Sequence, residues 1–195
     1  MHQLHKTPIK AKDIIPIVAK YPYQRWQMDL VIIGSRKETP DGSSLTAYSG
    51  NNGYKYIFTI IDTFTKFAHT VPLKTRTSTT VAAALQEVLD CEMEIDIQHC
   101  PSVLQSDNEF DNDEFKQLCD KYGIKQVFSK SHVSSSGAIE RFNCTLKSAI
   151  WQEFTMQSAN NGNNTKKWVD ILPKITTNYN NTWHTVTKQI TPNQW

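Results

Sequence analysis

Three short runs of apolar and β-branched residues follow one another in the first part of the chain, and they restrict the folds it can adopt. The runs cover residues 25–33 (RWQMDLVII), 54–61 (YKYIFTII) and 68–73 (AHTVPL). Runs of this length and composition predict β-strands. Because the second and third runs are joined by a short connection, we expect an antiparallel meander. The intervening segment 34–53 is rich in Gly, Ser and Asn, and it predicts a loop or an extended hairpin tip.

The pattern changes after residue 77, where helical periodicity alternates with two further short strands. Helices are expected over residues 78–89, 111–122, 138–157 and 168–179, with a last one opening at Thr191-Pro192, and strands over residues 102–105 and 124–128. The element order β-β-β-α-β-α-β-α-α predicts an α/β fold in which helices flank a five-stranded mixed sheet. This order fits a ribonuclease-H-like domain.

Length and charge suggest how the chain is organised. Its 195 residues suit one domain with a short appendage, and its net charge is +2. The first 25 residues carry a net +4, so the remainder carries −2. We interpret residues 1–22 as a basic linker and residues 23–195 as the folded domain. A basic lead-in segment suits contact with a polyanion, and a solvated linker explains it equally well.

Several classes of protein are not expected. The sequence contains no run of about 18 apolar residues, and its start lacks the apolar stretch of a signal peptide, so we expect no membrane association. The four cysteines, Cys91, Cys100, Cys119 and Cys144, show no CxxC or paired spacing. Reduced thiols in an intracellular protein are therefore expected, and a structural zinc site is not.

Three carboxylates stand at unusual places in this pattern. Asp29 lies inside an apolar strand, Asp107 follows another strand, and Glu140 lies near the start of a helix. Each alone has an ordinary explanation: a bond to backbone or arginine for Asp29, a helix cap for Asp107 and a favourable helix dipole for Glu140. Together they predict an all-oxygen site suited to Mg²⁺ or Mn²⁺. Two such ions can promote in-line attack of a hydroxyl on a phosphodiester.

The same residues resemble the DDE motif of retroviral-type integrases, with Asp29 in WQMDL, Asp107 in LQSDNEF and Glu140 in GAIERFNCTLK. The likeness is closer to the integrases of Maverick/Polinton elements and virophages, through NNGYKYIFTIIDTFTKFAHTVPLKT and KKWVDILPKITTNYNNTWHTVTKQITPNQW, and it spans roughly residues 23–195. It implies a DNA integrase catalytic core, a polynucleotidyl transferase that holds two Mg²⁺ or Mn²⁺ ions at the three carboxylates. Such an enzyme trims the 3′ ends of element DNA and joins them to target DNA.

The resemblance also implies partners and a location. The expected partners are element-end DNA, target DNA and further copies of the chain, in a homodimer or higher homo-oligomer. The expected location is inside the cell, in the host nucleus, with packaging in a virus particle as a further option. Asn143 and Lys147 follow Glu140 at i+3 and i+7, so they share one helix face with it, and both are expected to contact DNA. Lys130 precedes the polar segment 131–137 and is either a further DNA contact or a solvated lysine.

The chain departs from the family pattern in three respects. The Gly and further residue that usually separate D-N from E-F are missing, so Asp107 and Glu140 are 33 residues apart, and the turn after Asp107 must differ. Cys144 stands where relatives carry a basic residue. The upstream zinc-binding and downstream DNA-binding modules of the family are not found in the sequence. The alternatives are a domesticated or inactive integrase-fold DNA-binding or assembly protein, and an RNase H or transposase on the same fold.

The remaining expectations concern the structure of the domain. The helix around Glu140 should pack against the core through its apolar side, and Asp62 should have a structural role at a strand turn. The acidic residues at 87, 90, 92, 94 and 96 should form a solvated edge after a helix. Helical tryptophans should pack in the core more often than at a dimer interface. The helix side chains expected in the core are Ile139, Phe142, Leu146 and Ile150. The tryptophans in question are Trp151, Trp168 and Trp183.

Overall fold

The computed structural model describes residues 18–39, 42–128, 137–161, 166–184 and 190–195. Its strands are β1 (Arg25–Ile32), β2 (Ser35–Thr39), β3 (Gly42–Thr46), β4 (Tyr56–Asp62), β5 (Ala68–Leu73), β6 (Val103–Ser106) and β7 (Lys125–Phe128). Its α-helices are α1 (Ser78–Ile95), α2 (Asp113–Tyr122), α3 (Gly137–Asn161) and α4 (Leu172–Asn180), and short 3-10 helices cover Ile97–His99, Asn108–Phe110 and Pro192–Gln194.

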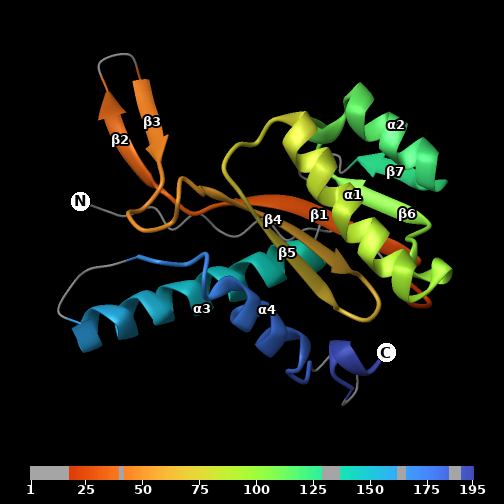
Figure 1. Ribbon diagram of the computed structural model, residues 1–195. Helices are drawn as coiled ribbons and strands as arrows, with labels where there is room; N and C mark the ends of the chain where they lie inside the picture. The colour runs from red at the N-terminus through yellow and green to blue at the C-terminus, as the bar shows by residue number, and fades with distance from the viewer. Residues whose placement is uncertain (1–17, 40–41, 129–136, 162–165, 185–189) are drawn as a thin grey trace, which may run out of the picture.

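The main sheet has five strands in the order β5-β4-β1-β6-β7. Strand β1 is antiparallel to β4, which is antiparallel to β5, whereas β1, β6 and β7 run parallel. This confirms the five-stranded mixed sheet and its antiparallel meander. The segment expected to be a loop or hairpin tip forms the β2–β3 hairpin, a separate two-stranded sheet that extends away from the main sheet (Figure 1).

Helices cover both faces of the sheet, and strand β4 lies between two hydrophobic clusters (Figure 1). Phe58 and Ile60 pack in the cluster that includes α1 and α2 side chains. Ile57 and Ile61, which point the other way, pack in the cluster that includes α3 and α4 side chains. Successive side chains of a strand point to opposite faces, so a strand buried on both faces reads as a continuous apolar run.

Helix α1 is longer than the sequence pattern indicated. It begins after Thr77, whose side chain accepts a hydrogen bond from the Thr80 backbone N–H, and it continues to Ile95. The acidic residues therefore lie mostly within the helix, and the expectation of a solvated edge after it is wrong for Glu92, whose side chain is buried. Helix α2 ends at Gly123, whose φ of 67° is the left-handed conformation that glycine adopts most readily.

Helix α4 is shorter than expected because the residues before it are held by another part of the chain. The backbone N–H groups of Trp168 and Val169 donate to Asn51 Oδ1 at 2.8 and 3.2 Å, and the helix begins only at Leu172. Trp168 is fully buried, as expected, whereas Trp151 and Trp183 are about half exposed, so the core assignment is wrong for these two.

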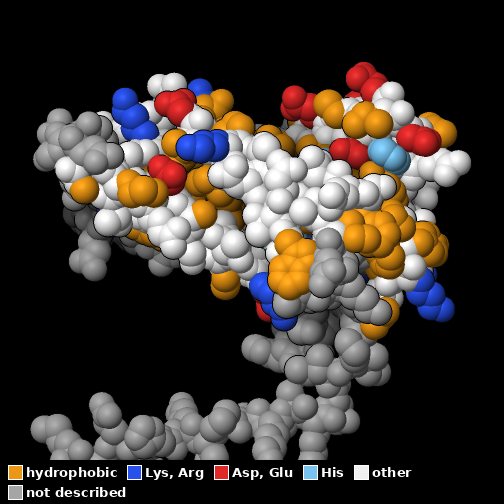
Figure 2. Space-filling model, turned by 90° about the horizontal axis from the view of Figure 1, so that it is seen from below, with side chains coloured by type: hydrophobic (Ala, Val, Ile, Leu, Met, Phe, Trp, Pro, Cys, Tyr) orange, Lys and Arg blue, Asp and Glu red, His pale blue; other side chains and the backbone are white. Residues whose placement is uncertain are grey.

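The apolar side of α3 packs as predicted, with Ile139, Phe142, Leu146 and Ile150 all buried in the cluster on that face of the sheet. All four cysteines are free thiols. Within the described ranges, no helix combines the length and apolar character needed to cross a membrane. On the face shown in Figure 2, acidic side chains lie mostly at the end where α1 is found.

Candidate active site

Strand register brings the two aspartates together. In the parallel pairing of β1 and β6, Arg25 lies opposite Val103 and Gln27 lies opposite Gln105. Continuing this register by two residues places Asp107, at the carboxyl end of β6, beside Asp29. Neighbouring strands are about 4.8 Å apart. The sheet therefore places at adjacent positions two carboxylates that are 78 residues apart in sequence.

Asp29 is held in place from two directions. It lies on the same face of β1 as Val31, which packs in the cluster under α3. Its Oδ1 accepts a hydrogen bond from the Leu30 backbone N–H at 2.7 Å, and its Oδ2 accepts one from Asn143 Nδ2 on α3 at 2.8 Å. The strand and the helix thus fix the orientation of one carboxylate.

The electrostatic environment of Asp29 is unfavourable for an isolated anion. Burial raises the pKa of its carboxyl above the ordinary value, and the negative charges of Asp107 and Glu109 raise it further. The hydrogen bond from the Leu30 N–H and the positive charge of Lys147 act in the opposite direction. Such crowding of like charges is relieved by a bound cation.

The turn after Asp107 is short in the structure. A single 3-10 turn, Asn108–Phe110, follows Asp107 directly, and Phe110 is buried. This turn carries Glu109, which is exposed but close enough to affect the pKa of Asp29. Sequence reasoning assigned no role to Glu109, because its proximity to Asp29 depends on the shape of this turn.

Two buried glutamines support the site, and sequence reasoning missed both. Gln27 Nε2 donates to Gln105 Oε1 at 3.2 Å, and Arg25 Nη1 donates to the same oxygen at 3.1 Å. Gln27 Oε1 accepts from the Ile139 backbone N–H at 3.1 Å, which attaches the first turn of α3 to β1. A repeated pattern was available in the sequence: each aspartate follows a glutamine by two residues, as Gln27-Met28-Asp29 and Gln105-Ser106-Asp107.

Helix α3 carries the other expected site residues. Glu140 lies exposed in its first turn and Lys147 lies exposed two turns later, whereas Asn143 is only 5% exposed and contacts Asp29. The described residues contain no group of three or more His, Cys, Asp or Glu side chains placed to hold a metal ion. The structure therefore brings Asp29 and Asp107 together but does not assemble Glu140 with them. Lys130 lies outside the described residues.

Asp62 has the structural surroundings that the sequence indicated. It ends β4, and its carboxylate accepts hydrogen bonds from the backbone N–H groups of Tyr23, Phe64 and Thr65 at 2.7–2.8 Å. These bonds fix the turn into β5 and anchor the start of the core domain.

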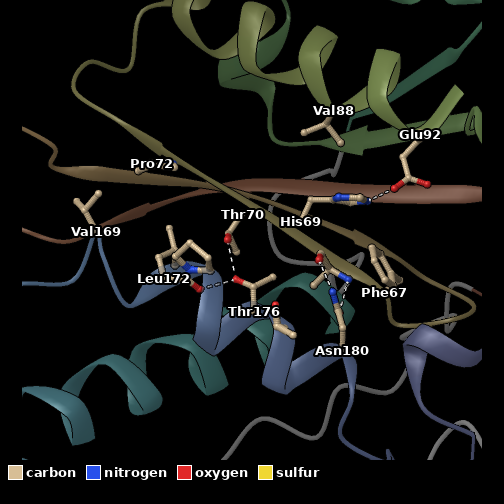
Figure 3. A pocket seen from close by; sticks show the side chains of 13 residues that line it. Phe67, His69, Thr70, Pro72, Val88, Glu92, Val169, Leu172, Thr176 and Asn180 are labelled. Atoms are coloured by element: carbon tan, nitrogen blue, oxygen red, sulfur yellow. Dashed lines mark hydrogen bonds and ion pairs between the residues drawn. The ribbon is translucent and has the colours of Figure 1, made fainter. Parts of the chain in front are cut away.

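A separate pocket of about 380 Å³ lies between α1, β5 and α4, away from the aspartates (Figure 3). One of its walls carries His69 and Glu92, with His69 Nε2 3.5 Å from Glu92 Oε1. Burial lowers the pKa of His69 to about 4 and raises the pKa of Glu92. At neutral pH this contact therefore joins a neutral imidazole to the carboxyl group.

Comparison with known proteins agrees with this arrangement. The family model for the integrase core domain matches residues 19–134, a range that includes Asp29 and Asp107 and ends before α3. The Gag-Pol polyprotein of feline leukemia virus is 31% identical over 136 residues, 68% of this chain. The retrovirus-related Pol polyprotein from transposon gypsy of Drosophila melanogaster is 30% identical over 139 residues, 69% of this chain. The chain spans only 7% and 12% of the lengths of these two relatives.

Solved structures show the same fold. A chain of the simian T-cell lymphotropic virus intasome, in complex with PP2A regulatory subunit B56 gamma, matches with a TM-score of 0.68 at 19% identity, covering 93% of this chain and 57% of that one. The dimeric form of the HTLV-2 integrase catalytic core domain, in complex with magnesium, matches with a TM-score of 0.60 at 19% identity, covering 89% and 95%. The fold is thus ribonuclease-H-like, and the chain belongs to the integrase core domain family, a family of polynucleotidyl transferases.

Proposed function

We propose that the chain is the catalytic core of a DNA integrase that processes the 3′ ends of a mobile or viral DNA and joins them to target DNA. The observation that carries this proposal is the β1–β6 register, which sets Asp29 beside Asp107. Burial raises the pKa of Asp29, and the negative charge of Asp107 raises it further. Carboxylates at fixed positions can hold the divalent ions of a two-metal centre, which promotes in-line displacement at a phosphodiester.

The residues present fit a divalent metal centre. Asp29 and Asp107 supply carboxylate oxygens from adjacent strands, and Glu140 supplies a third from the exposed side of α3. The buried Oδ1 of Asn143 has no hydrogen-bond partner in the described part of the chain, which leaves an oxygen available to a ligand or its water. These hard oxygen donors suit Mg²⁺ or Mn²⁺, and the HTLV-2 core in complex with magnesium supports this assignment.

Each protein group has a task in the proposed reaction. Asp29 and Asp107 would hold the metal ions, two per site in our proposal, and Asn143 orients Asp29. Glu140 completes the site from α3, and Lys147 lies where it would contact a DNA phosphate. Asn143 and Lys130 stay as proposed DNA contacts. Bound divalent ions would activate the attacking oxygen and stabilise the leaving oxygen of the phosphodiester.

The biological setting is part of the proposal. The W…LP…YN…H…P pattern after residue 167 supports an element of the Maverick/Polinton or virophage kind. Intasome and dimeric relatives support a homo-oligomer acting on element-end and target DNA. Because the substrate is DNA, we place the activity inside the cell, in the host nucleus, with the protein also carried in virus particles. In this scheme residues 1–22 are a basic linker and residues 23–195 are the core domain.

A second candidate is an integrase-fold protein that binds or assembles on DNA without catalysis. The observation that favours it is the separation of Glu140 from the two aspartates in the described structure, together with the shortened turn after Asp107. The two candidates differ in one measurable property, which is metal-dependent DNA joining.

The test is disintegration, the reverse of strand joining, on a branched DNA substrate with Mn²⁺. We expect the wild-type chain to resolve the branch and Glu140→Gln to lose activity by at least about a hundredfold, since Glu140 would hold metal. Glu114→Gln is a matched control, because Glu114 occupies the first turn of α2 as Glu140 does that of α3. Equal rates for wild type and Glu140→Gln, or no resolution by either, would favour the non-catalytic candidate.

A further inference from the structure

Three segments distant in sequence form one strongly basic part of the surface. Residues 47–55, 73–77 and 166–169 contain five basic residues and no acid, whereas the whole chain has a net charge of +2. The remainder of the chain therefore carries −3. The basic residues are Lys55, Lys74, Arg76, Lys166 and Lys167.

Hydrogen bonds hold these segments together. The buried side chain of Asn51 donates to the Lys166 backbone oxygen at 2.7 Å and accepts from the Trp168 backbone N–H. These bonds attach the turn around Asn51, in segment 47–55, to segment 166–169. The Lys55 backbone N–H donates to the Leu73 backbone oxygen at 3.0 Å, which attaches segment 47–55 to segment 73–77. At Gly50, where φ is +82°, a Cβ atom would lie 2.7 Å from Lys167 Cε, so this lysine lies directly over the turn.

Aromatic rings lie among the lysines. Lys166 Nζ is 4.7 Å from the ring centre of Tyr48 and 5.1 Å from that of Trp151, and Lys74 Nζ is 5.1 Å from that of Tyr54. In the described part of the chain, none of these lysines forms a salt bridge. We call this set the lysine–aromatic surface; it consists of Tyr48, Tyr54, Lys74, Trp151, Lys166 and Lys167. Its positive charges are positioned by packing and remain available to a polyanion.

Helix α3 connects this surface to the candidate active site. Trp151 follows Glu140 by eleven residues and Lys147 by four, so all three lie within about 40° of one another around the helix axis, and all are exposed. Eleven residues of helix span about 16 Å, which equals about five base pairs of duplex DNA. Glu153, which follows Trp151 by two residues, lies on the opposite side of α3, where it lines another pocket.

We propose that the lysine–aromatic surface binds the phosphate backbone of duplex DNA about five base pairs from the end that lies at Glu140. The placement of the DNA end at Glu140 rests on the proposed function. Lysine ammonium groups contact phosphates, and the half-exposed Trp151 ring packs against the sugars. Contact of this kind is independent of base sequence and strongly dependent on salt.

The test is duplex binding measured by fluorescence anisotropy in EDTA, where the metal site makes no contribution. The variant Lys74→Gln/Lys167→Gln removes two charges and keeps the side-chain stems. We expect its affinity to fall by at least about tenfold at 0.1 M salt, and the slope of log K against log salt to fall by about two. The control Lys121→Gln/Lys125→Gln removes two exposed charges at the end of α2 and the start of β7 and should bind as wild type does.

Equal affinities for the two double variants, or no duplex binding by the wild type, would overturn the proposal. Neither result depends on catalysis, because binding is measured in EDTA, where the metal-dependent reaction cannot proceed. The two proposals can fail separately. If Glu140→Gln abolishes disintegration but Lys74→Gln/Lys167→Gln binds DNA as the wild type does, the proposed function stands and this surface is excluded as a DNA-binding site.

Discussion

Asn143 connects the helix of the candidate site to its first carboxylate. Its amide nitrogen donates to Asp29 Oδ2, and its amide oxygen is buried without a partner in the described part of the chain. From the sequence, this residue was expected to contact DNA. The structure also gives it a place from which it can orient a metal ligand, a role that side chains behind a metal site often have.

Removal of this side chain should weaken metal binding while the fold persists. We expect Asn143→Ala to lower Mn²⁺ affinity by about 10–100-fold, because Asp29 loses the hydrogen bond that fixes its orientation. Calorimetric titration with Mn²⁺ measures the effect directly. Asn178→Ala, an exposed asparagine on α4, serves as the control. Mn²⁺ affinities within twofold of each other would show that Asn143 does not position a ligand.

At the residue scale, the sequence indicated the two aspartates because an acid in an apolar strand needs a cation or a hydrogen-bond partner. It could not indicate Glu109, whose effect on Asp29 depends on the shape of the 3-10 turn that follows Asp107. Burial of Asn143 was equally hidden, since a helix face alone does not say how closely the helix approaches β1.

Among the elements, α3 has the attachment that matters most for the site. Its first turn is joined to β1 by the hydrogen bond from Ile139 N–H to Gln27 Oε1, and Gln27 in turn bonds Gln105 on β6. The first backbone N–H groups of a helix have no partner within the helix, so a buried side chain that accepts from one of them fixes the helix position.

This attachment predicts a local effect of Gln27→Ala. We expect the amides at the start of α3 to exchange hydrogen about tenfold faster or more, because a buried N–H and the Gln105 side chain both lose a partner, at a cost of about 1–3 kcal/mol. Hydrogen exchange followed by mass spectrometry resolves this segment. Gln117→Ala on the exposed side of α2 should leave it unchanged. If the amides at the start of α3 exchange hydrogen at the same rate in Gln27→Ala and in Gln117→Ala, Gln27 does not fix the position of this helix.

The order and type of the elements were predictable because hydrophobic periodicity determines them locally. The ends of α1 and α4 were not. Helix α1 continues through an acidic stretch because Glu92 faces the interior, where Tyr23, His69 and His99 contact it. Helix α4 starts late because a turn more than a hundred residues earlier binds the backbone before it. Both are tertiary contacts that no local pattern contains.

For the whole molecule, the buried His69 makes stability depend on pH. Because its pKa is lowered from 6.5 to about 4, the unfolded chain binds a proton between these values that the folded chain does not. The free energy of unfolding therefore falls as pH drops through this window, by about 2 kcal/mol at pH 5. The raised pKa of Glu92 acts in the opposite sense, since its folded form keeps a proton more readily.

The contribution of His69 can be isolated with His69→Gln in a Glu92→Gln background. We expect the double variant to lose less stability than Glu92→Gln alone when the pH is lowered from 7 to 5, by about 2 kcal/mol, because glutamine does not titrate. Urea unfolding at the two pH values measures the difference. Parallel losses of stability would mean that His69 is protonated in the folded state.

The central claim is that Asp29 and Asp107, placed side by side by the sheet, hold a catalytic divalent metal. Crystals soaked in Mn²⁺ test it most directly through anomalous diffraction. We expect an anomalous peak between the two carboxylates that is absent from Asp29→Asn crystals, with Glu140 free to join once DNA is bound. A peak at another group of carboxylates, or none between Asp29 and Asp107 at saturating Mn²⁺, would contradict it.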